Sequence, residues 1–280
     1  MNQQKTSAQL KALAKEQLLG NYGKIAGAFA VIVAIYFAVF SIAYTIGIAG
    51  VLASVAIAGT QVTGALIGSV LIIFLIVLII VALFYCMEVG LIYMSLQISR
   101  GNKIELKDVF FAFTHHPDKV LGLFFLFYFL NILMSIPACV VEIVYAEEVT
   151  DIASPMFCLY IVFYLAALVG SVILSLVYAL RFYFYCDHPE MKAFEGMKQS
   201  RIALRGQKGR LFYIGLSFIG WYCLVLLSCG LAAFWVTPYA LTVLANFYRD
   251  IRGEFNPVNP VDTANPTFVE HVPENIDITV

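Results

Sequence analysis

Apolar stretches long enough to cross a bilayer constrain the fold of this chain more than any other feature. A transmembrane α-helix needs about 20 apolar residues, because it rises about 1.5 Å per residue and a hydrocarbon core is about 30 Å thick. Six stretches approach or exceed this length: Lys24–Gly50, Gly64–Cys86, Val120–Val141, Met156–Phe182, Leu211–Ser228 and Leu231–Phe247. With 61% hydrophobic and 12% charged residues, the chain is predicted to be all-α, a polytopic transmembrane helix bundle of six spans with short amphipathic cytoplasmic helices.

The basic residues indicate how these spans are oriented. All 17 Lys and Arg residues lie before the first span, between the second and third, around the link from the fourth to the fifth, or after the sixth. Six spans place all these groups on one face, which the positive-inside rule identifies as cytoplasmic. The sequence therefore predicts a multi-pass protein of the cell membrane with both termini in the cytoplasm. In the alternative, one long broken helix runs through Cys229-Gly230, which leaves five spans and places Arg249 and Arg252 outside.

The chain divides into three parts. Residues 1–23 are predicted to form an amphipathic cytoplasmic helix, which Thr6 or Ser7 caps and Gly20 ends. This helix could lie in the inner membrane surface or pack as a cap on the bundle. Residues 24–252 form the membrane domain. Residues 253–280 are rich in proline and acidic residues and contain no Lys or Arg, a composition typical of a disordered acidic tail.

A second cytoplasmic helix is predicted near residues 188–206. Asp187-His188-Pro189-Glu190 is typical of a helix start, because proline fits the first turn and acids favour the positive end of the helix dipole. The bases that follow include Arg201 and Arg205, which are candidate contacts for anionic phospholipids at the cytoplasmic face. The alternative is that these charges only set the topology.

One acidic residue, Glu88, lies within or at the edge of a long apolar run. A single helix from Gly64 to Ser99 would be about 54 Å long, so it must tilt, break or protrude from the bilayer. Gly90 is the natural place for a bend. Intramembrane carboxylates are costly and mark paths for ions, protons or polar substrates. If the span ends near Cys86, however, Glu88 is merely interfacial.

Arg181 is the basic counterpart of Glu88 and lies among the aromatic residues from Tyr178 to Tyr185. It could extend its charge to the inner interface from an aromatic belt. It could instead pair with Glu88 or hold a lipid phosphate through paired hydrogen bonds. Together with Arg201 and Arg205, these two residues are the candidates for a polar path or a head-group site.

Two short segments resemble each other. They are Leu91 to Gly101 and Leu241 to Gly253. Each is an apolar helical segment that contains aromatic residues and ends with Arg-Gly. Such an echo could reflect a duplicated helical hairpin, and internal repeats are common in transporters.

No catalytic or cofactor motif is found. None of the six cysteines forms a CxxC or zinc-type spacing, and His115-His116 has no Cys or carboxylate at ligand spacing. Phosphate-loop, GxSxG, HExxH and dinucleotide fingerprints are absent from the sequence. We therefore expect no enzyme, no cofactor, no metal and no nucleic-acid partner.

Several strings resemble one uncharacterised family of bacterial membrane proteins. They are Leu18-Leu19-Gly20-Asn21-Tyr22-Gly23-Lys24, Ser99-Arg100-Gly101, Gly196-Met197-Lys198-Gln199-Ser200-Arg201, Leu216-Ser217-Phe218-Ile219-Gly220-Trp221, Trp235-Val236-Thr237-Pro238-Tyr239 and Ala245-Asn246-Phe247-Tyr248. With these strings the chain resembles the family catalogued as domain of unknown function 975, up to about Arg252. The resemblance implies a polytopic protein of the bacterial cell membrane, and it brings no established activity.

Three classes of function follow from these observations. One class is a non-enzymatic membrane scaffold or assembly factor, which would bind an unknown membrane protein within the lipid bilayer. It is favoured by the absence of catalytic and cofactor motifs, by the basic cytoplasmic face and by the acidic tail. The alternative is a lipid-handling protein or small-molecule carrier built on Glu88 and Arg181. An intramembrane enzyme would need converging nucleophiles, acids or metal ligands, which the sequence lacks.

Overall fold

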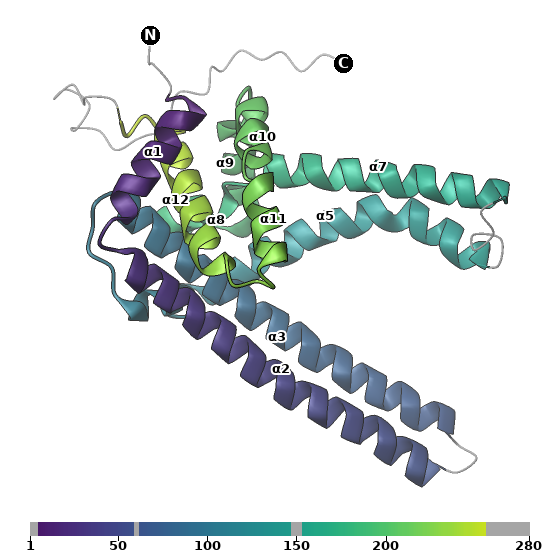
Figure 1. Cartoon of the computed structure of the whole chain (residues 1–280). Coiled ribbons are helices and arrows are strands. Elements are labelled where there is room, and N and C mark those ends of the chain that lie inside the picture. Colours follow the sequence, from purple (N-terminus) through teal and green to yellow (C-terminus); the bar gives the residue numbers. More distant parts are fainter. Residues whose placement is uncertain (1–4, 59–61, 147–152, 256–280) are drawn as a thin grey trace.

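The computed structural model describes residues 5–58, 62–146 and 153–255, and these ranges are almost entirely helical (Figure 1). The elements in chain order are α1 (Ser7–Leu18), α2 (Tyr22–Ala58), α3 (Val62–Ser99), the 3₁₀ helix η1 (Leu106–Phe110), α4 (Phe111–Thr114), α5 (Pro117–Val144), α7 (Pro155–Val177), α8 (Arg181–Asp187), α9 (Ala193–Ala203), α10 (Lys208–Leu216), α11 (Ile219–Leu227) and α12 (Ala233–Ile251). No strand occurs within these ranges, and the predicted all-α class is confirmed.

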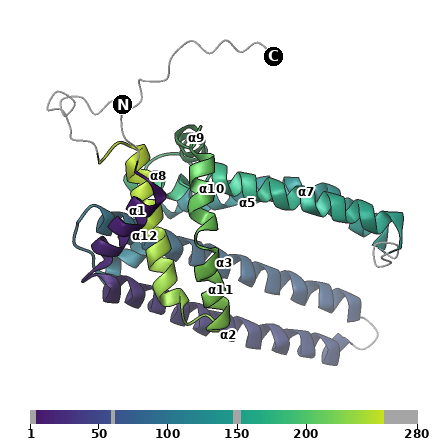
Figure 2. The ribbon, with the colours of Figure 1, turned by 45° about the horizontal axis from the view of Figure 1, so that its top comes forward.

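Two long helical hairpins project from a common base (Figures 1 and 2). One consists of α2 and α3, the other of α5 and α7, and the far ends of both point to the same side of the molecule. The hairpins meet where α3 contacts α5, for example through the rings of Tyr85 and Phe124, whose centroids are 4.2 Å apart. Beyond this contact they diverge.

The base contains the buried core of the described residues. It is formed by α1, the last turns of α3, η1, α4, α8 and the second half of α12. Its largest fully buried side chains include Tyr183, Tyr185, Phe247 and Tyr248. Because α3 is buried by these elements from Cys86 onward, it does not stop at the end of the apolar hairpin but continues into the base.

α3 does not break at Gly90, where we predicted a bend. The helix is continuous from Val62 to Ser99. A Cβ atom at position 90 would lie 1.9 Å from the carbonyl oxygen of Val109 in η1. The residue is therefore needed for close packing of two backbones, and the long helix protrudes into the base instead of breaking.

Five described helical segments are long and apolar enough to cross a membrane, rather than the six that we predicted. They are Tyr22–Gly50, Leu71–Ser99, Pro117–Val144, Pro155–Asp187 and Lys208–Leu227. The predicted sixth span, Leu231–Phe247, forms α12, which is not among them. Its second half is buried against α1, α2 and α3 and ends with the charged residues Arg249 and Asp250, so α12 belongs largely to the base.

The last two helices are nevertheless separate. Cys229 and Gly230 have φ angles of 49° and 90° and reverse the chain between α11 and α12. The two helices pack against each other, and the C-terminal end of α12 returns to the base (Figure 1). The alternative of one long broken helix is therefore wrong. The turn itself exposes Leu226, Leu227 and Leu231.

The N-terminal helix forms as predicted. Thr6 caps α1 through a capping box with Gln9, and Gly20 follows its end with a φ of 83°. Leu10, Ala14 and Leu18 are fully buried against α12 and neighbouring elements. Of the two alternatives for this helix, the structure therefore favours a cap that packs on the bundle.

The helix predicted near residues 188–206 begins later than expected. Asp187 ends α8, and α9 starts only at Ala193, after a turn that contains Pro189 and Glu190. The reason is that the Asp187 carboxylate binds Arg100 instead of serving a helix start. Of the predicted acidic tail, residues 256–280 lie outside the described residues.

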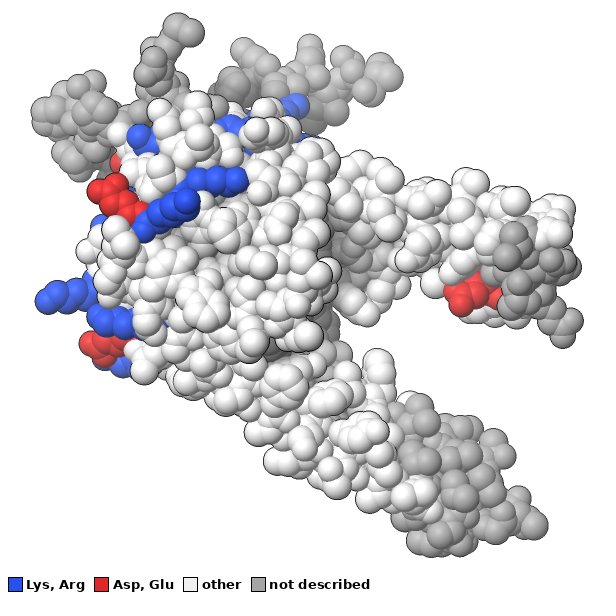
Figure 3. Space-filling model, in the orientation of Figure 1, with Lys and Arg blue, Asp and Glu red and all other residues white. Residues whose placement is uncertain are grey.

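Charge separates the base from the hairpins. Figure 3 shows Lys and Arg residues gathered on the base, whereas the described hairpin surface in this view carries none. The hairpins instead expose large apolar side chains along their length, among them Phe37, Phe74, Phe129 and Val162. Such continuous apolar surface on separate helices is compatible with a membrane and not with water.

Candidate functional site at the junction of the hairpins

The predicted residues Glu88 and Arg181 lie near each other where the hairpins diverge. Glu88 lies on α3, at the start of the segment that is buried in the base, and Arg181 is the first residue of α8. α3, α5 and α8 contact one another here. The two opposite charges are close enough to attract each other, and Tyr85 lies within the electrostatic reach of both. We call these three residues and their aromatic neighbours the hairpin junction.

Aromatic rings hold the guanidinium of Arg181. Its Cζ atom lies 4.1 Å from the ring centroid of Phe127 and 4.4 Å from that of Phe182. Nη1 donates a hydrogen bond of 2.9 Å to the carbonyl oxygen of Tyr178. Nε is buried and has no hydrogen-bond partner among the described residues. The rings thus fix the orientation of the guanidinium but leave much of its donor capacity unused.

Glu88 also lacks a direct partner. The residue is half-buried, and no hydrogen bond from a described residue acts on its carboxylate, only the charge of Arg181. A carboxylate away from bulk water is costly unless a proton, a water molecule or a ligand satisfies it. The structure therefore places Glu88 and Arg181 close enough for their charges to interact, but it does not join them in the ion pair that we considered.

Arg201 and Arg205 lie elsewhere. Both belong to the region of α9 and are exposed, and their side chains point away from the polar contacts described above. Ser200 fixes α9 to the end of α7, because its Oγ accepts from the amide of Leu180 and donates to the carbonyl of Val177, each at 3.2 Å. The two arginines thus face outward beside the hairpin base, outside the hairpin junction.

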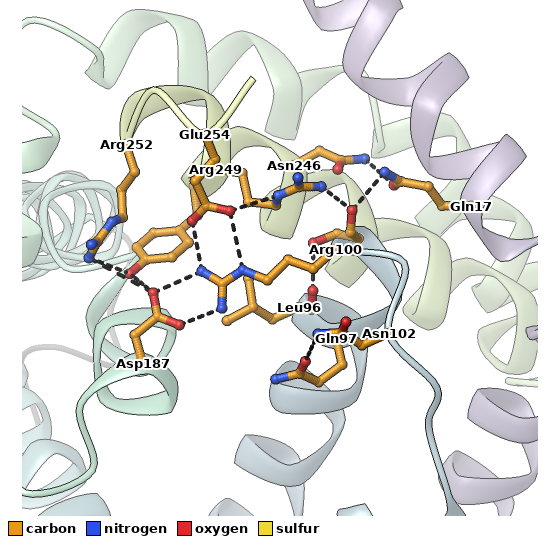
Figure 4. Close-up of polar contacts among 12 residues, drawn as sticks. Gln17, Leu96, Gln97, Arg100, Asn102, Asp187, Asn246, Arg249, Arg252 and Glu254 are labelled. Atoms are coloured by element: carbon orange, nitrogen blue, oxygen red, sulfur yellow. Dashed lines mark hydrogen bonds and ion pairs between the residues drawn. The ribbon is translucent and has the colours of Figure 1, made fainter. Parts of the chain in front are cut away.

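A second polar cluster in the base was missed in the sequence analysis (Figure 4). Arg100 binds Asp187 through two hydrogen bonds of 2.7 and 3.0 Å and also binds Glu254 at 2.7 Å. Glu254 accepts a further bond from Arg249 at 2.9 Å, and Asp187 accepts one from the Tyr248 hydroxyl at 2.7 Å. Paired guanidinium–carboxylate bonds are strong and directional. We call this cluster the arginine network.

The network controls the protonation of its members. Burial alone would lower the pKa of Arg100, but the hydrogen bonds and charges of Asp187 and Glu254 outweigh burial and raise this pKa above its ordinary value. Burial, reinforced by the charge of Asp187, raises the pKa of the Tyr248 hydroxyl. Arg100 is therefore charged and Tyr248 neutral near pH 7, and the network joins α3, α8 and α12.

The similar Arg-Gly ends of the two segments account for part of the geometry of the arginine network. A glycine of positive φ lies two residues after the last residue of α3 and of α12, with φ angles of 77° at Gly101 and 73° at Gly253. In each case the next amide bonds the carbonyl five residues earlier, at 3.0 Å for Asn102 and 2.9 Å for Glu254, which is a Schellman cap. The shared string is thus a shared helix ending that presents an arginine to Asp187.

The described residues offer no group of three or more His, Cys, Asp or Glu that could hold a metal ion. All six cysteines are free, and four of them are exposed on the helices or turns outside the base. The hairpin junction has one carboxylate and one guanidinium, which can bind charged or polar groups.

These features define a multi-pass α-helical membrane protein with two apolar hairpins on a charged base. The chain belongs to the family described as protein of unknown function DUF975, whose model matches residues 1–254. The resemblance seen in the sequence is thereby confirmed, and the match includes every residue of the arginine network. No curated protein and no solved structure matches the chain.

Proposed function

We propose that this chain is a non-enzymatic scaffold or assembly factor of the cell membrane, whose hairpins bind another integral membrane protein. The observation that carries the proposal is how little of the hairpin surface the chain covers itself. In the most apolar window of Pro155–Asp187 only 6% of the residues are buried, and the corresponding shares for Tyr22–Gly50 and Leu71–Ser99 are 17% and 22%.

The helix α7 illustrates this surface. It packs closely on α5 at Gly170, where an added Cβ would lie 2.9 Å from Cε of Met134. On its other faces Val162, Leu165 and Val169 are exposed. Transmembrane helices associate through shape-matched packing, and a base joined by the arginine network would hold two such surfaces at a fixed separation. A rigid pair of apolar surfaces supports a role in organising a partner within the bilayer.

The location that we propose follows from charge. The Lys and Arg residues gather on the base (Figure 3), and the positive-inside rule then supports a cytoplasmic base with both termini inside. A reporter fused after Arg252 is expected to be cytoplasmic, and a signal from outside the cell would reject this orientation.

The partner can be tested by substitution on the exposed face of α7. The wild type, gently extracted with its native lipids, is expected to carry one other integral membrane protein at fixed stoichiometry in native mass spectrometry. Val169→Trp should remove this partner while size-exclusion behaviour and thermal stability persist. The matched control Leu226→Trp, on the exposed turn before α12, should retain it. A wild type that carries only lipids or further copies of itself would contradict the proposal.

A lipid-handling function is the second candidate, and the surface of α9 favours it. Phe194, Lys198, Arg201 and Arg205 recur at helical spacing and are all exposed. An exposed aromatic residue beside bases matches an anionic phospholipid surface, where each base contributes about 1 kcal/mol. On this candidate, exchanging both arginines for Gln should lower the retention of anionic lipids, and unchanged retention would count against it.

A further inference from the structure

The hairpin junction holds two opposite charges that are not joined to each other. Arg181 has a buried Nε without a partner, and Glu88 is influenced by the charge of Arg181 but by no hydrogen bond from a described residue. A pair that served only to bind α3 to α8 would be expected to close into direct contact, as Arg100 and Asp187 do at 2.7 Å. The unused donors and acceptors instead match a third group that carries both charges.

We propose that the hairpin junction binds the head group of a zwitterionic phospholipid with a primary ammonium, of the phosphatidylethanolamine class. The phosphate would accept paired hydrogen bonds from the Arg181 guanidinium. The ammonium, which has three donors, would bind the Glu88 carboxylate. The site and the head group each carry one positive and one negative charge, so binding leaves neither charge uncompensated.

The depth of the junction supports this ligand. On α3 the exposed large apolar side chains end at Phe84, one turn before Glu88. On α7 they end at Ile173, about two turns before Arg181, and on α5 they begin at Phe125. All three helices thus place the junction at the base-side limit of their apolar surface. In a membrane this is the level at which the acyl chains end and the head groups begin.

The surroundings favour a lipid over a free phosphate ion. The guanidinium lies against Phe127 and Phe182, and Phe124 packs against Tyr85 on the other side of the junction. Beyond them the exposed rings of Phe125 and Phe129 continue along α5. Acyl chains would follow this apolar surface away from the base, whereas a free ion would gain nothing from it.

The test compares lipids that differ only in the head group. The purified full-length chain is equilibrated with equal amounts of phosphatidylethanolamine, phosphatidylcholine and phosphatidylglycerol with identical acyl chains, and the retained lipid is identified by native mass spectrometry. The wild type is expected to retain one phosphatidylethanolamine about tenfold more often than either competitor, the discrimination typical of one hydrogen bond to a charged group. Phosphatidylcholine lacks the ammonium donors, and phosphatidylglycerol lacks the positive charge.

The variants separate the two contacts. Glu88→Gln should abolish the preference for phosphatidylethanolamine while phosphatidylglycerol still binds, and Arg181→Lys should weaken all three lipids because a single ammonium cannot make the paired bonds. The exposed pair Glu105 and Lys107, 2.7 Å apart, provides matched controls: Glu105→Gln and Lys107→Gln should retain the wild-type preference. A wild type without head-group preference, or a Glu88→Gln variant that keeps it, refutes the site. Inorganic phosphate that displaces the lipid completely would refute the need for an acyl chain.

Discussion

The close approach of α3 and η1 at Gly90 makes a sharp prediction for Gly90→Ala. The added Cβ would lie 1.9, 2.5 and 2.7 Å from the O, C and Cα atoms of Val109. Ordinary contact needs about 3.5 Å, and all three obstructing atoms are backbone, so η1 as a whole must move by well over 1 Å. Alanine gains about 1 kcal/mol over glycine in a helix, but overpacking costs about 1–3 kcal/mol and more where backbone must shift. We expect a net loss of about 2 kcal/mol in the free energy of unfolding.

The matched control is Gly27→Ala in α2. There the nearest atom to an added Cβ is Cδ2 of Leu106, at 3.8 Å, so the substitution should be neutral or slightly stabilising. Local opening can be followed by maleimide labelling of the buried Cys86 and Cys186 in a background that lacks the four exposed cysteines. A loss of 2 kcal/mol should speed labelling by about 30-fold. If Gly90→Ala reacts as slowly as Gly27→Ala, the backbone contact is not present.

Three further predictions concern the base. Asp187→Asn removes the shared counter-charge of Arg100 and should destabilise the fold by about 2–3 kcal/mol, between the values of a surface and a buried ion pair; an unchanged melting temperature would contradict this. Tyr248→Phe removes the 2.7 Å bond to Asp187 and should cost about 1.5 kcal/mol. The pKa of Tyr248 in the folded protein is raised above its ordinary value of 10.0, so the wild type should lose stability as the pH rises above about 10. When the melting temperature is measured from pH 8 to 11, this loss should be smaller in Tyr248→Phe. Asp250 accepts hydrogen bonds from the amide of Lys5 at 3.2 and 3.3 Å, so Asp250→Ala should accelerate trypsin cleavage after Lys5; equal cleavage rates would count against this anchoring.

The hairpins were predictable because their signals are local. Apolar length marks each membrane helix, and the placement of Lys and Arg marks the side to which the base belongs. The count failed only at α12, where apolar content resembled a span. Its buried face, which includes Tyr239, Thr242 and Asn246, packs on other helices of the chain, and only the tertiary structure reveals that packing.

The candidate site was predicted only in part. Glu88 and Arg181 stand out in sequence because a charge inside an apolar run is rare. The arginine network does not stand out, because Arg100 finds its partners 87 and 154 residues away and each member looks like an ordinary interfacial charge. The only sequence signal for the network was the similarity of the two Arg-Gly segments. This similarity indicates a shared helix cap but not the partners of the arginines. Gly90 shows a related limit, since the same residue permits a bend or a close contact.

The separation of the hairpins gives the molecule a mechanical property. α2 has 37 residues and is about 55 Å long at about 1.5 Å per residue, and its hairpin meets the other through α3 and α5 near the base. Each hairpin is thus a lever with its pivot at the junction of Glu88 and Arg181. A small rotation at the pivot becomes a large sideways displacement at the far end, so lateral pressure on the far ends of the hairpins would act with the greatest leverage on the contacts in the base.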